Sequence, residues 1–230
     1  MPLGLITGAS KGLGRAAARG LAAQGWDLIV DARDADALTT AFADTPRVTT
    51  IDGDVTDPLH RQALARAVGD RPLDLLVNNA SRLGPSPQPP LATYDLDELR
   101  RVYDTNVVAP LALTQLLLPA LHAAPAGTIV NVTSDASVEA YAGWGGYGSS
   151  KAALDQLSAI LAEEQRELRV YAFDPGDMRT EMHQAAFPGE DISDRPEPET
   201  VVPAVVALLD RRPPSGRIRA ADVLAPVGAC

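Results

Sequence analysis

LGLITGASKGLGRAAARGLAAQG, residues 3–25, is the stretch that decides the expected fold. Its first four residues are apolar or small and predict a short buried strand. Glycines follow at positions 8, 12 and 14, and the alanine-rich run after them predicts a helix that Gly25 ends. A glycine turn between a strand and a helix lets the backbone approach a pyrophosphate, and the first N–H groups of the helix point at its charge. A tight turn without a ligand is the plainer alternative.

Composition narrows the class of protein. The chain has 230 residues, of which 46% are hydrophobic, so it can bury a large core and global disorder is excluded. A net charge of −10 argues against a nucleic-acid-binding surface, which needs a basic stripe. One cysteine, Cys230, excludes an intrachain disulfide and suits a reducing compartment. The first residues, MPLGLITGAS, lack a basic segment typical of signal peptides, and no uninterrupted apolar run has transmembrane length. We therefore expect a cytoplasmic protein with no membrane partner and no bound metal.

The alternation of strand and helix continues along the whole chain. We expect a single doubly wound parallel-sheet Rossmann domain over residues 1–230, of the α/β class with helices on both faces of the sheet. The expected strands are 3–6, 26–30, 48–51, 73–77, 129–132 and 168–173, with a short last strand at 215–219. Expected helices include 34–43, 95–122 in two segments, 152–161 and 199–210. Residues 181–198 are polar and proline-rich, which is typical of a substrate lid.

The end of the second strand bears on cofactor choice. In a dinucleotide fold an acid at this point accepts hydrogen bonds from a free ribose 2′-OH, whereas an arginine suits a 2′-phosphate. Asp31 and Arg33 are both present, and Lys11 in the glycine turn adds a second cation. The two cations favour NADP(H), and Asp31 keeps NAD(H) as the less favoured alternative. Asp54, after the third strand, could accept a hydrogen bond from an adenine amino group.

A second stretch, residues 128–151, carries the chemistry. It runs from the strand at 129–132 into Ser134 and on to Tyr147 and Lys151, which are four residues apart at the start of an expected helix. This spacing puts the phenol and the ammonium on one face, where the cation should lower the pKa of Tyr147. Ser134 could hold a substrate oxygen against the phenol. A tyrosine and a lysine on an exposed helix face are the plainer alternative.

With these residues in place, the chain resembles a classical short-chain dehydrogenase/reductase over nearly its whole length. The motifs that carry the resemblance are the glycine turn at 7–14, Asp54, Asn78-Asn79-Ala80-Ser81, Asn106, Ser134, Tyr147 with Lys151, and Pro175 to Thr180. The family has glycine where this chain has Ser81, which adds a side chain near the nicotinamide. In the family, a basic residue at the position of Lys11 and an arginine at that of Arg33 go with NADP(H). Asp31 lies one place too early to be the usual NAD-selecting acid.

The resemblance implies the roles of the site residues. Tyr147 would be the general acid or base, Lys151 would lower its pKa and bind the nicotinamide ribose, and Ser134 would orient the substrate oxygen. Asn106 would hold a water that links Lys151 to solvent. Cofactor contacts would come from Gly8, Ser10, Lys11, Gly12, Leu13, Gly14, Arg33, Asp54, Val55, Asn79, Ala80, Tyr147, Lys151, Pro175, Gly176, Met178 and Thr180.

The expected activity is that of an NADPH-dependent carbonyl reductase, reversible as an alcohol dehydrogenase. A non-catalytic NADP(H)-sensing regulator is the alternative, and an epimerase or dehydratase is less favoured. Ser81, Tyr141, Trp144 and Met182 are candidate substrate contacts by their position in the chain. Tyr141 and Trp144 could stack on an aromatic substrate or pack against the sheet. By analogy with the family, the helices 107–121 and 152–161 would form a homodimer or homotetramer interface.

Overall fold

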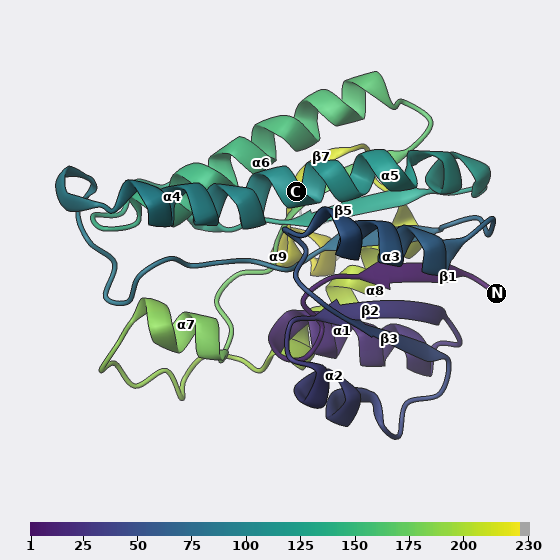
Figure 1. The fold of residues 1–230 in the computed structure, drawn as a ribbon, viewed down its shortest axis with the longest axis horizontal. Coiled ribbons are helices and arrows are strands. Elements are labelled where there is room, and N and C mark those ends of the chain that lie inside the picture. Colours follow the sequence, from purple (N-terminus) through teal and green to yellow (C-terminus); the bar gives the residue numbers. More distant parts are fainter. Residues whose placement is uncertain (226–230) are drawn as a thin grey trace.

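The computed structural model describes residues 1–225, and its seven strands form one parallel sheet in the order β3-β2-β1-β4-β5-β6-β7 (Figure 1). The chain winds outward from β1 to β3, returns to the centre, and then winds the other way, so the direction reverses between β1 and β4. The strands are β1 (Leu3–Ile6), β2 (Asp27–Ala32), β3 (Val48–Asp52), β4 (Leu75–Asn78), β5 (Thr128–Val132), β6 (Arg169–Asp174) and β7 (Gly216–Arg219). The predicted doubly wound sheet is confirmed, with strand ends shifted by one or two residues.

Helices cover both faces of the sheet, and each face has its own apolar core. The longer helices are α1 (Gly12–Ala23), α2 (Ala35–Phe42), α3 (Pro58–Val68), α4 (Leu96–Tyr103), α5 (Ala109–Ala123), α6 (Gly145–Glu164) and α8 (Val202–Arg211), and α7 (Glu181–Ala186) and α9 (Ala220–Leu224) are short. One core joins the sheet to α1, α2, α8 and α9, and the other joins it to α3, α5 and α6. Coverage on both sides explains why β1, β4 and β5 are apolar or fully buried along their length.

The glycine turn is required by close backbone contacts. Gly8 has φ +67°, and a Cβ there would lie 2.8 Å from the Cα of Ala80. A Cβ on Gly14 would lie 2.5 Å from the carbonyl oxygen of Gly8. Only glycine fits both positions, so the turn can pass tightly from β1 into α1 and leave the amino end of α1 open.

The helix expected at 95–122 is continuous from Leu96 to Ala123, with a π-helical turn, Asp104–Val108, between α4 and α5. By length and composition it is apolar enough to cross a membrane. The expectation concerned uninterrupted apolar runs and does not extend to this helix, in which Asn106, Thr114 and Gln115 interrupt the apolar residues. Core helices of water-soluble proteins share this character, and here Leu113, Leu117 and Leu121 are buried against the sheet.

Local signals in the sequence account for several helix ends. Asp57 caps α3, since its side chain accepts a hydrogen bond from the N–H of Leu59 and Pro58 occupies the first helical position.

The predicted lid, residues 181–198, contains the six-residue helix α7 rather than loop alone. In Figure 1, α7 stands apart from the two helical layers, on the side to which the strands point. Cys230 lies outside the described residues.

Candidate active site

A cavity of about 720 Å³ opens at the carboxyl ends of the strands. Its walls come from the glycine turn, the segments after β2 to β6, the start of α6, and α7. The predicted site residues on its lining are Gly8, Ser10, Lys11, Gly12, Leu13, Arg33, Asp54, Val55, Asn79, Ala80, Ser81, Ser134, Trp144, Tyr147, Lys151, Pro175, Gly176, Met178, Thr180 and Met182. Gly14, Asn106 and Tyr141 are not on this lining. The structure therefore brings almost all of the predicted positions to one hollow.

The amino end of α1 is open toward the cavity. Lys11 is the N-cap residue, and its side chain makes no capping hydrogen bond to the first turn. That turn carries no acidic side chain, so its N–H groups and partial positive charge face the cavity. Asn79 holds the turn in place, because its side-chain amide donates to the carbonyl oxygens of Thr7 and Gly8 at 2.8 and 3.1 Å. This end of the cavity suits an anion.

The carboxyl group of Asp31 is occupied by hydrogen bonds within the protein. It is buried, and its carboxyl group accepts hydrogen bonds from the N–H of Gly8 at 2.8 Å and from Nε2 of His60 at 2.9 Å. Burial raises the pKa of Asp31, against the effect of these two hydrogen bonds. Asp31 therefore supports the glycine turn. The expectation that it could select NAD(H) loses its physical basis, although nothing in the sequence marked Asp31 as buried.

Two cations lie on the cavity wall near the end of β2 and in the glycine turn. Arg33 is exposed, and its charge helps to lower the pKa of Asp54. Burial raises the pKa of Asp54, but the hydrogen bonds from Thr56 and the charge of Arg33 together lower it further than burial raises it. Lys11 forms an exposed ion pair with Glu181 of α7. The two cations predicted to meet a 2′-phosphate thus differ, since Lys11 already has an anionic partner.

Tyr147 and Lys151 are both buried in α6, at the base of the cavity. Nζ of Lys151 lies 5.5 Å from the centre of the Tyr147 ring and donates to the carbonyl oxygen of Val132 at 2.7 Å. Burial raises the pKa of Tyr147 to about 12, although the hydroxyl groups of Ser134 and Ser81 lower it. Burial also lowers the pKa of Lys151 to about 8. The expected lowering of the tyrosine pKa is therefore not found, because burial outweighs the hydrogen bonds that favour the phenolate.

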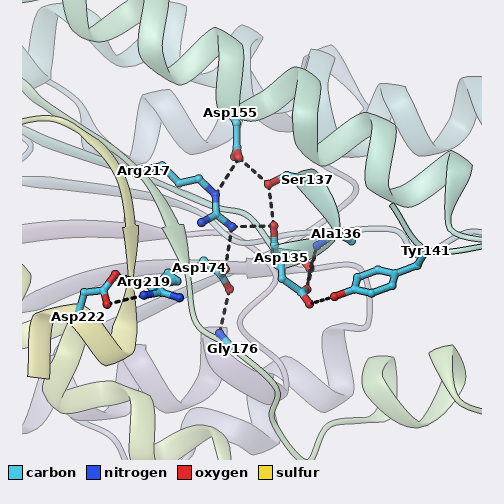
Figure 2. Close-up of polar contacts among 11 residues, drawn as sticks. Asp135, Ala136, Ser137, Tyr141, Asp155, Asp174, Gly176, Arg217, Arg219 and Asp222 are labelled. Carbon is cyan, nitrogen blue, oxygen red and sulfur yellow. Dashed lines mark hydrogen bonds and ion pairs between the residues drawn. The ribbon is translucent and has the colours of Figure 1, made fainter. Parts of the chain in front are cut away.

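Ser134 follows β5 and is engaged with its neighbours. Its hydroxyl donates to Oδ1 of Asp135 at 2.8 Å and accepts from the N–H of Ala136 at 3.2 Å. The second carboxylate oxygen of Asp135 accepts from the hydroxyl of Tyr141 at 2.9 Å (Figure 2). Asp135 lines the cavity, whereas Tyr141 does not. Sequence reasoning passed over Asp135, although its place directly after Ser134 was a usable signal.

Asn106 lies in the π-helical turn and is fully buried. Its Oδ1 accepts from the N–H of Arg82 at 2.7 Å and from the hydroxyl of Ser81 at 3.2 Å. Its Nδ2 donates to the carbonyl oxygen of Arg82 and to Oγ of Ser150, both at 2.9 Å. The side chain therefore joins the loop after β4 to α6. Ser81, the departure from the family pattern, is part of this connection.

Arg217 of β7 is a site residue that the sequence did not reveal (Figure 2). Its guanidinium donates to Asp174 at 2.8 Å, to Asp155 at 3.2 Å and to the carbonyl oxygen of Ser134 at 3.1 Å. Asp174 in turn accepts from the N–H of Gly176 at 3.0 Å. One side chain thus ties the serine loop, the loop after β6 and α6 together. Because these contacts join residues distant in the sequence, no local pattern could have indicated them.

Trp144 lies on the cavity lining and has three other aromatic rings around it. The ring centre of Trp144 lies 5.8 Å from that of Tyr141, 6.0 Å from that of Tyr147 and 5.5 Å from that of Phe187. The rings of Tyr141 and Tyr147 meet it edge to face. Tyr147 also packs with Leu83 and Ala136 in a small apolar cluster, which Trp144 and Met182 extend. The rings connect the loop before α6 to the segment after α7. This part of the cavity suits a flat or apolar group.

Comparisons with known proteins agree with this geometry. A family model described as short chain dehydrogenase matches residues 3–191. An uncharacterised oxidoreductase, YciK of Escherichia coli, is 33% identical over 215 residues, covering 89% of this chain and 84% of the relative. Benzil reductase ((S)-benzoin forming) of Bacillus subtilis is 34% identical over 189 residues, or 79% and 76% of the two chains. The crystal structure of a short chain dehydrogenase of Shigella flexneri, complexed with NADP, has a TM-score of 0.88 at 31% identity and covers 96% of this chain and 97% of its own.

Proposed function

The chain belongs to the short-chain dehydrogenase family of oxidoreductases, and we propose that it is an NADPH-dependent ketone reductase that also runs in reverse as an alcohol dehydrogenase. The observation that carries the proposal is that Ser134, Tyr147 and Lys151 lie on one cavity with an anion-binding helix end. The Shigella flexneri relative was solved with NADP, and the Bacillus subtilis relative is a benzil reductase. Trp144 and Met182 support a substrate with an aromatic or apolar substituent.

The residues of the cavity fit NADP(H). Gly8 and Gly14 leave no room for side chains, so the backbone can meet a pyrophosphate closely at the start of α1. Arg33 is the cation better placed for a 2′-phosphate, since Lys11 already pairs with Glu181. Asp31 is occupied by Gly8 and His60 and does not compete for the ribose. Within residues 1–225, the buried hydroxyl of Thr133 on the cavity lining has no hydrogen-bond partner and is available to a bound cofactor. Bound NADPH supplies the hydride that adds to the carbonyl carbon.

Tyr147 supports the proton side of the reaction. With a pKa of about 12, its phenol is fully protonated at neutral pH and can donate to a carbonyl oxygen. Ser134 would orient that oxygen by hydrogen bonding. Lys151 would replace the proton, and its pKa of about 8 lets it gain or lose one near neutral pH.

A water path to Lys151 is supported by the π-helical turn. The side chain of Asn106 is occupied by four hydrogen bonds, so a water would bind its main-chain carbonyl instead. Pro110 stands four residues later and has no N–H, which removes the usual α-helical donor to that carbonyl. The carbonyl of Asn106 can therefore accept from a water between α5 and α6.

Replacement of Tyr147 by Phe tests the proposal. We expect Tyr147→Phe to lower kcat/KM for an aromatic ketone by about 10³-fold, because the proton donor is lost while the ring remains. The dissociation constant for NADPH, measured by fluorescence titration, should change less than about threefold. Tyr103→Phe, outside the cavity, is the matched control and should retain parental turnover. A non-catalytic sensor would bind NADPH equally well in all three proteins and reduce no ketone in any of them.

Cofactor preference has a separate test. Arg33→Ala should raise the dissociation constant for NADPH by about tenfold or more, because a charge-assisted hydrogen bond to the 2′-phosphate is lost. The constant for NADH should stay within about twofold. Arg19→Ala, which removes an exposed arginine of α1, should change neither constant. Equal weakening of both cofactors by Arg33→Ala would contradict the assignment of Arg33.

We also propose that α5 and α6 form the interface of a homodimer or homotetramer. Val108 and Leu116 are 53% and 45% exposed, and Ile160 of α6 is 44% exposed, although their helices are strongly apolar. Burial of these side chains by a second copy would remove them from water. Light scattering coupled to size-exclusion chromatography should give at least twice the 24.2 kDa monomer mass. Leu116→Glu should shift the protein toward the monomer.

A further inference from the structure

Asp135 is a carboxylate held beside the reacting groups. Its Oδ1 accepts from the hydroxyl of Ser134 and from the N–H of Ala136, each at 2.8 Å. Its Oδ2 accepts from the hydroxyl of Tyr141 at 2.9 Å, as Figure 2 shows. Three donors therefore fix the orientation of one exposed side chain on the cavity lining. A side chain fixed in this way can favour a substrate that carries a hydrogen-bond donor at one particular position.

The carboxylate also retains capacity for a ligand. A carboxylate oxygen can accept two hydrogen bonds, and among the described residues Oδ2 of Asp135 accepts one. Its negative charge extends to the reacting phenol, since it contributes, after burial, to the raised pKa of Tyr147. The hydrogen bond to Asp135 also raises the pKa of Tyr141 and keeps that hydroxyl a donor. The carboxylate of Asp135, on the cavity lining, therefore has an acceptor position left and a charge that acts on Tyr147.

The contact between Ser134 and Asp135 has a further consequence. The hydroxyl of Ser134 donates its proton to Asp135, so this proton is directed at the carboxylate. A substrate with its own donor could satisfy Asp135 and leave the serine hydroxyl, which rotates freely, to bond the carbonyl oxygen. In an α-hydroxy ketone the two oxygens are about one hydrogen-bond length apart. The substrate hydroxyl can therefore replace the Ser134 hydroxyl on Oδ1 or use the second acceptor position of Oδ2, while the carbonyl oxygen accepts from Ser134.

We propose that Asp135 is a specificity-determining residue that selects α-hydroxy ketones and rejects ketones with a carboxylate next to the carbonyl. The inference rests on the proposed reductase function. The substrate hydroxyl donates to Asp135, and the carbonyl oxygen accepts from Ser134 and Tyr147. Hydride from NADPH forms the new C–H bond, the carbonyl π pair moves to oxygen, and oxygen takes the proton of Tyr147. The products are a vicinal diol and NADP⁺, and Asp135 keeps its charge throughout.

Three aryl ketones of similar size distinguish these effects. They are 2-hydroxyacetophenone, propiophenone, in which a methyl replaces the hydroxyl, and benzoylformate, which carries the carboxylate. For the parent, we expect kcat/KM for 2-hydroxyacetophenone to be about tenfold higher than kcat/KM for propiophenone. We expect kcat/KM for benzoylformate to be about tenfold lower than kcat/KM for propiophenone. Each factor corresponds to about 1.4 kcal/mol. Ratios between substrates cancel any general loss of rate in a variant.

Asp135→Asn keeps the shape and removes the charge. We expect the ratio of kcat/KM for benzoylformate to kcat/KM for propiophenone to rise about tenfold. The ratio for 2-hydroxyacetophenone to propiophenone should fall at least threefold. Asp135→Glu, which keeps the charge, should still reject benzoylformate. Glu139→Gln removes a charge from the same loop outside the cavity lining and should leave both ratios unchanged.

Substrate ratios in Asp135→Asn within twofold of the parental ratios would overturn the role of Asp135 while leaving the reductase function intact. A parent that reduces none of the three ketones would contradict both the function and the inference. A parent that prefers propiophenone over the hydroxy ketone would overturn the inference alone. These outcomes separate the two claims in one set of assays.

Discussion

Two walls of the cavity are held by different kinds of contact. The inner wall is built from β4, β5 and α6, and its polar side chains are buried and bonded to one another, as in the chain Asn78, Asn131 and Ser158. The outer wall, residues 177–198, is held largely by ion pairs at the surface, such as Lys11–Glu181 and Arg179–Glu197. Buried hydrogen bonds are costly to leave unmade, whereas exposed ion pairs contribute little. We therefore expect the inner wall, which carries the proposed catalytic residues, to be the more rigid of the two.

The largest difference between the walls should appear when one amide is removed from each. Asn131→Ala removes one buried hydrogen bond from the amide of Asn78, which keeps only its longer contact with Thr114, and one from Ser158, which still donates to Leu154. It should lower the free energy of unfolding by about 2 kcal/mol. Gln184→Ala on the outer wall removes two exposed contacts to carbonyl oxygens and should cost less than about 0.5 kcal/mol. Urea unfolding measures both. Similar losses would contradict the division into a rigid and a mobile wall.

The pH dependence of turnover should report the inner wall. Because the pKa of Tyr147 is about 12, its phenol stays protonated through the assay range, while Lys151 loses its proton above pH 8. We expect kcat/KM for ketone reduction to fall about tenfold per pH unit above this value, because the lysine charge is then lost. Asp155→Asn should move the midpoint to lower pH, since the charge of Asp155 raises the pKa of Lys151. A flat profile to pH 10 would exclude Lys151 as the titrating group.

A buried lysine should also cost stability. The pKa of Lys151 falls from 10.5 to about 8 on folding, a cost of about 3 kcal/mol at pH 7 that its hydrogen bond to Val132 partly offsets. Lys151→Met should therefore raise the free energy of unfolding by about 1–2 kcal/mol while abolishing turnover. The cost is present in full below pH 8 and is relieved as pH rises from 8 to 10.5. The advantage of the variant should shrink over that range, and a constant advantage would contradict this account.

The smallest effect is expected on the outer wall. Glu181→Gln breaks the ion pair with Lys11, which is exposed, and should change the free energy of unfolding by less than about 0.5 kcal/mol. It should also free Lys11 and tighten NADPH binding about twofold at low salt, with no gain at high salt. Glu190→Gln, in the same segment, is the control and should alter neither quantity. Weaker NADPH binding in Glu181→Gln would mean that Lys11 does not meet the phosphate.

Much of the fold could be predicted because its signals are local. The strand, glycine turn and helix of residues 3–25 lie within one short stretch, and Asp57 with Pro58 marks a helix start. Motif residues such as Ser134 and Tyr147 were found by spacing, and the parallel sheet brings them to one edge. The helix at 96–123 was expected as two segments, but the π-helical turn keeps it continuous.

Other features of the site depend on packing between distant parts of the chain. Arg217 reaches Asp155 and Asp174 from the last strand, and no spacing rule connects them. The pKa of Tyr147 was expected to fall, because the proximity of Lys151 could be inferred whereas the depth of burial could not. The hydrogen bond between Asp31 and His60 of α3 could not be predicted either, because the two residues are neighbours only in the folded protein.

The ring contacts of Trp144 give the protein an optical signal of its own. The chain has two tryptophans, and Trp26 packs near the start of β2, away from the cavity lining. Trp26→Phe would therefore leave a single emitter among Tyr141, Tyr147 and Phe187. Reduced nicotinamide absorbs where tryptophan emits, so cofactor binding would quench this emission by energy transfer. Movement of the segment after α7 would alter it again, and stopped-flow fluorescence could time the two events separately.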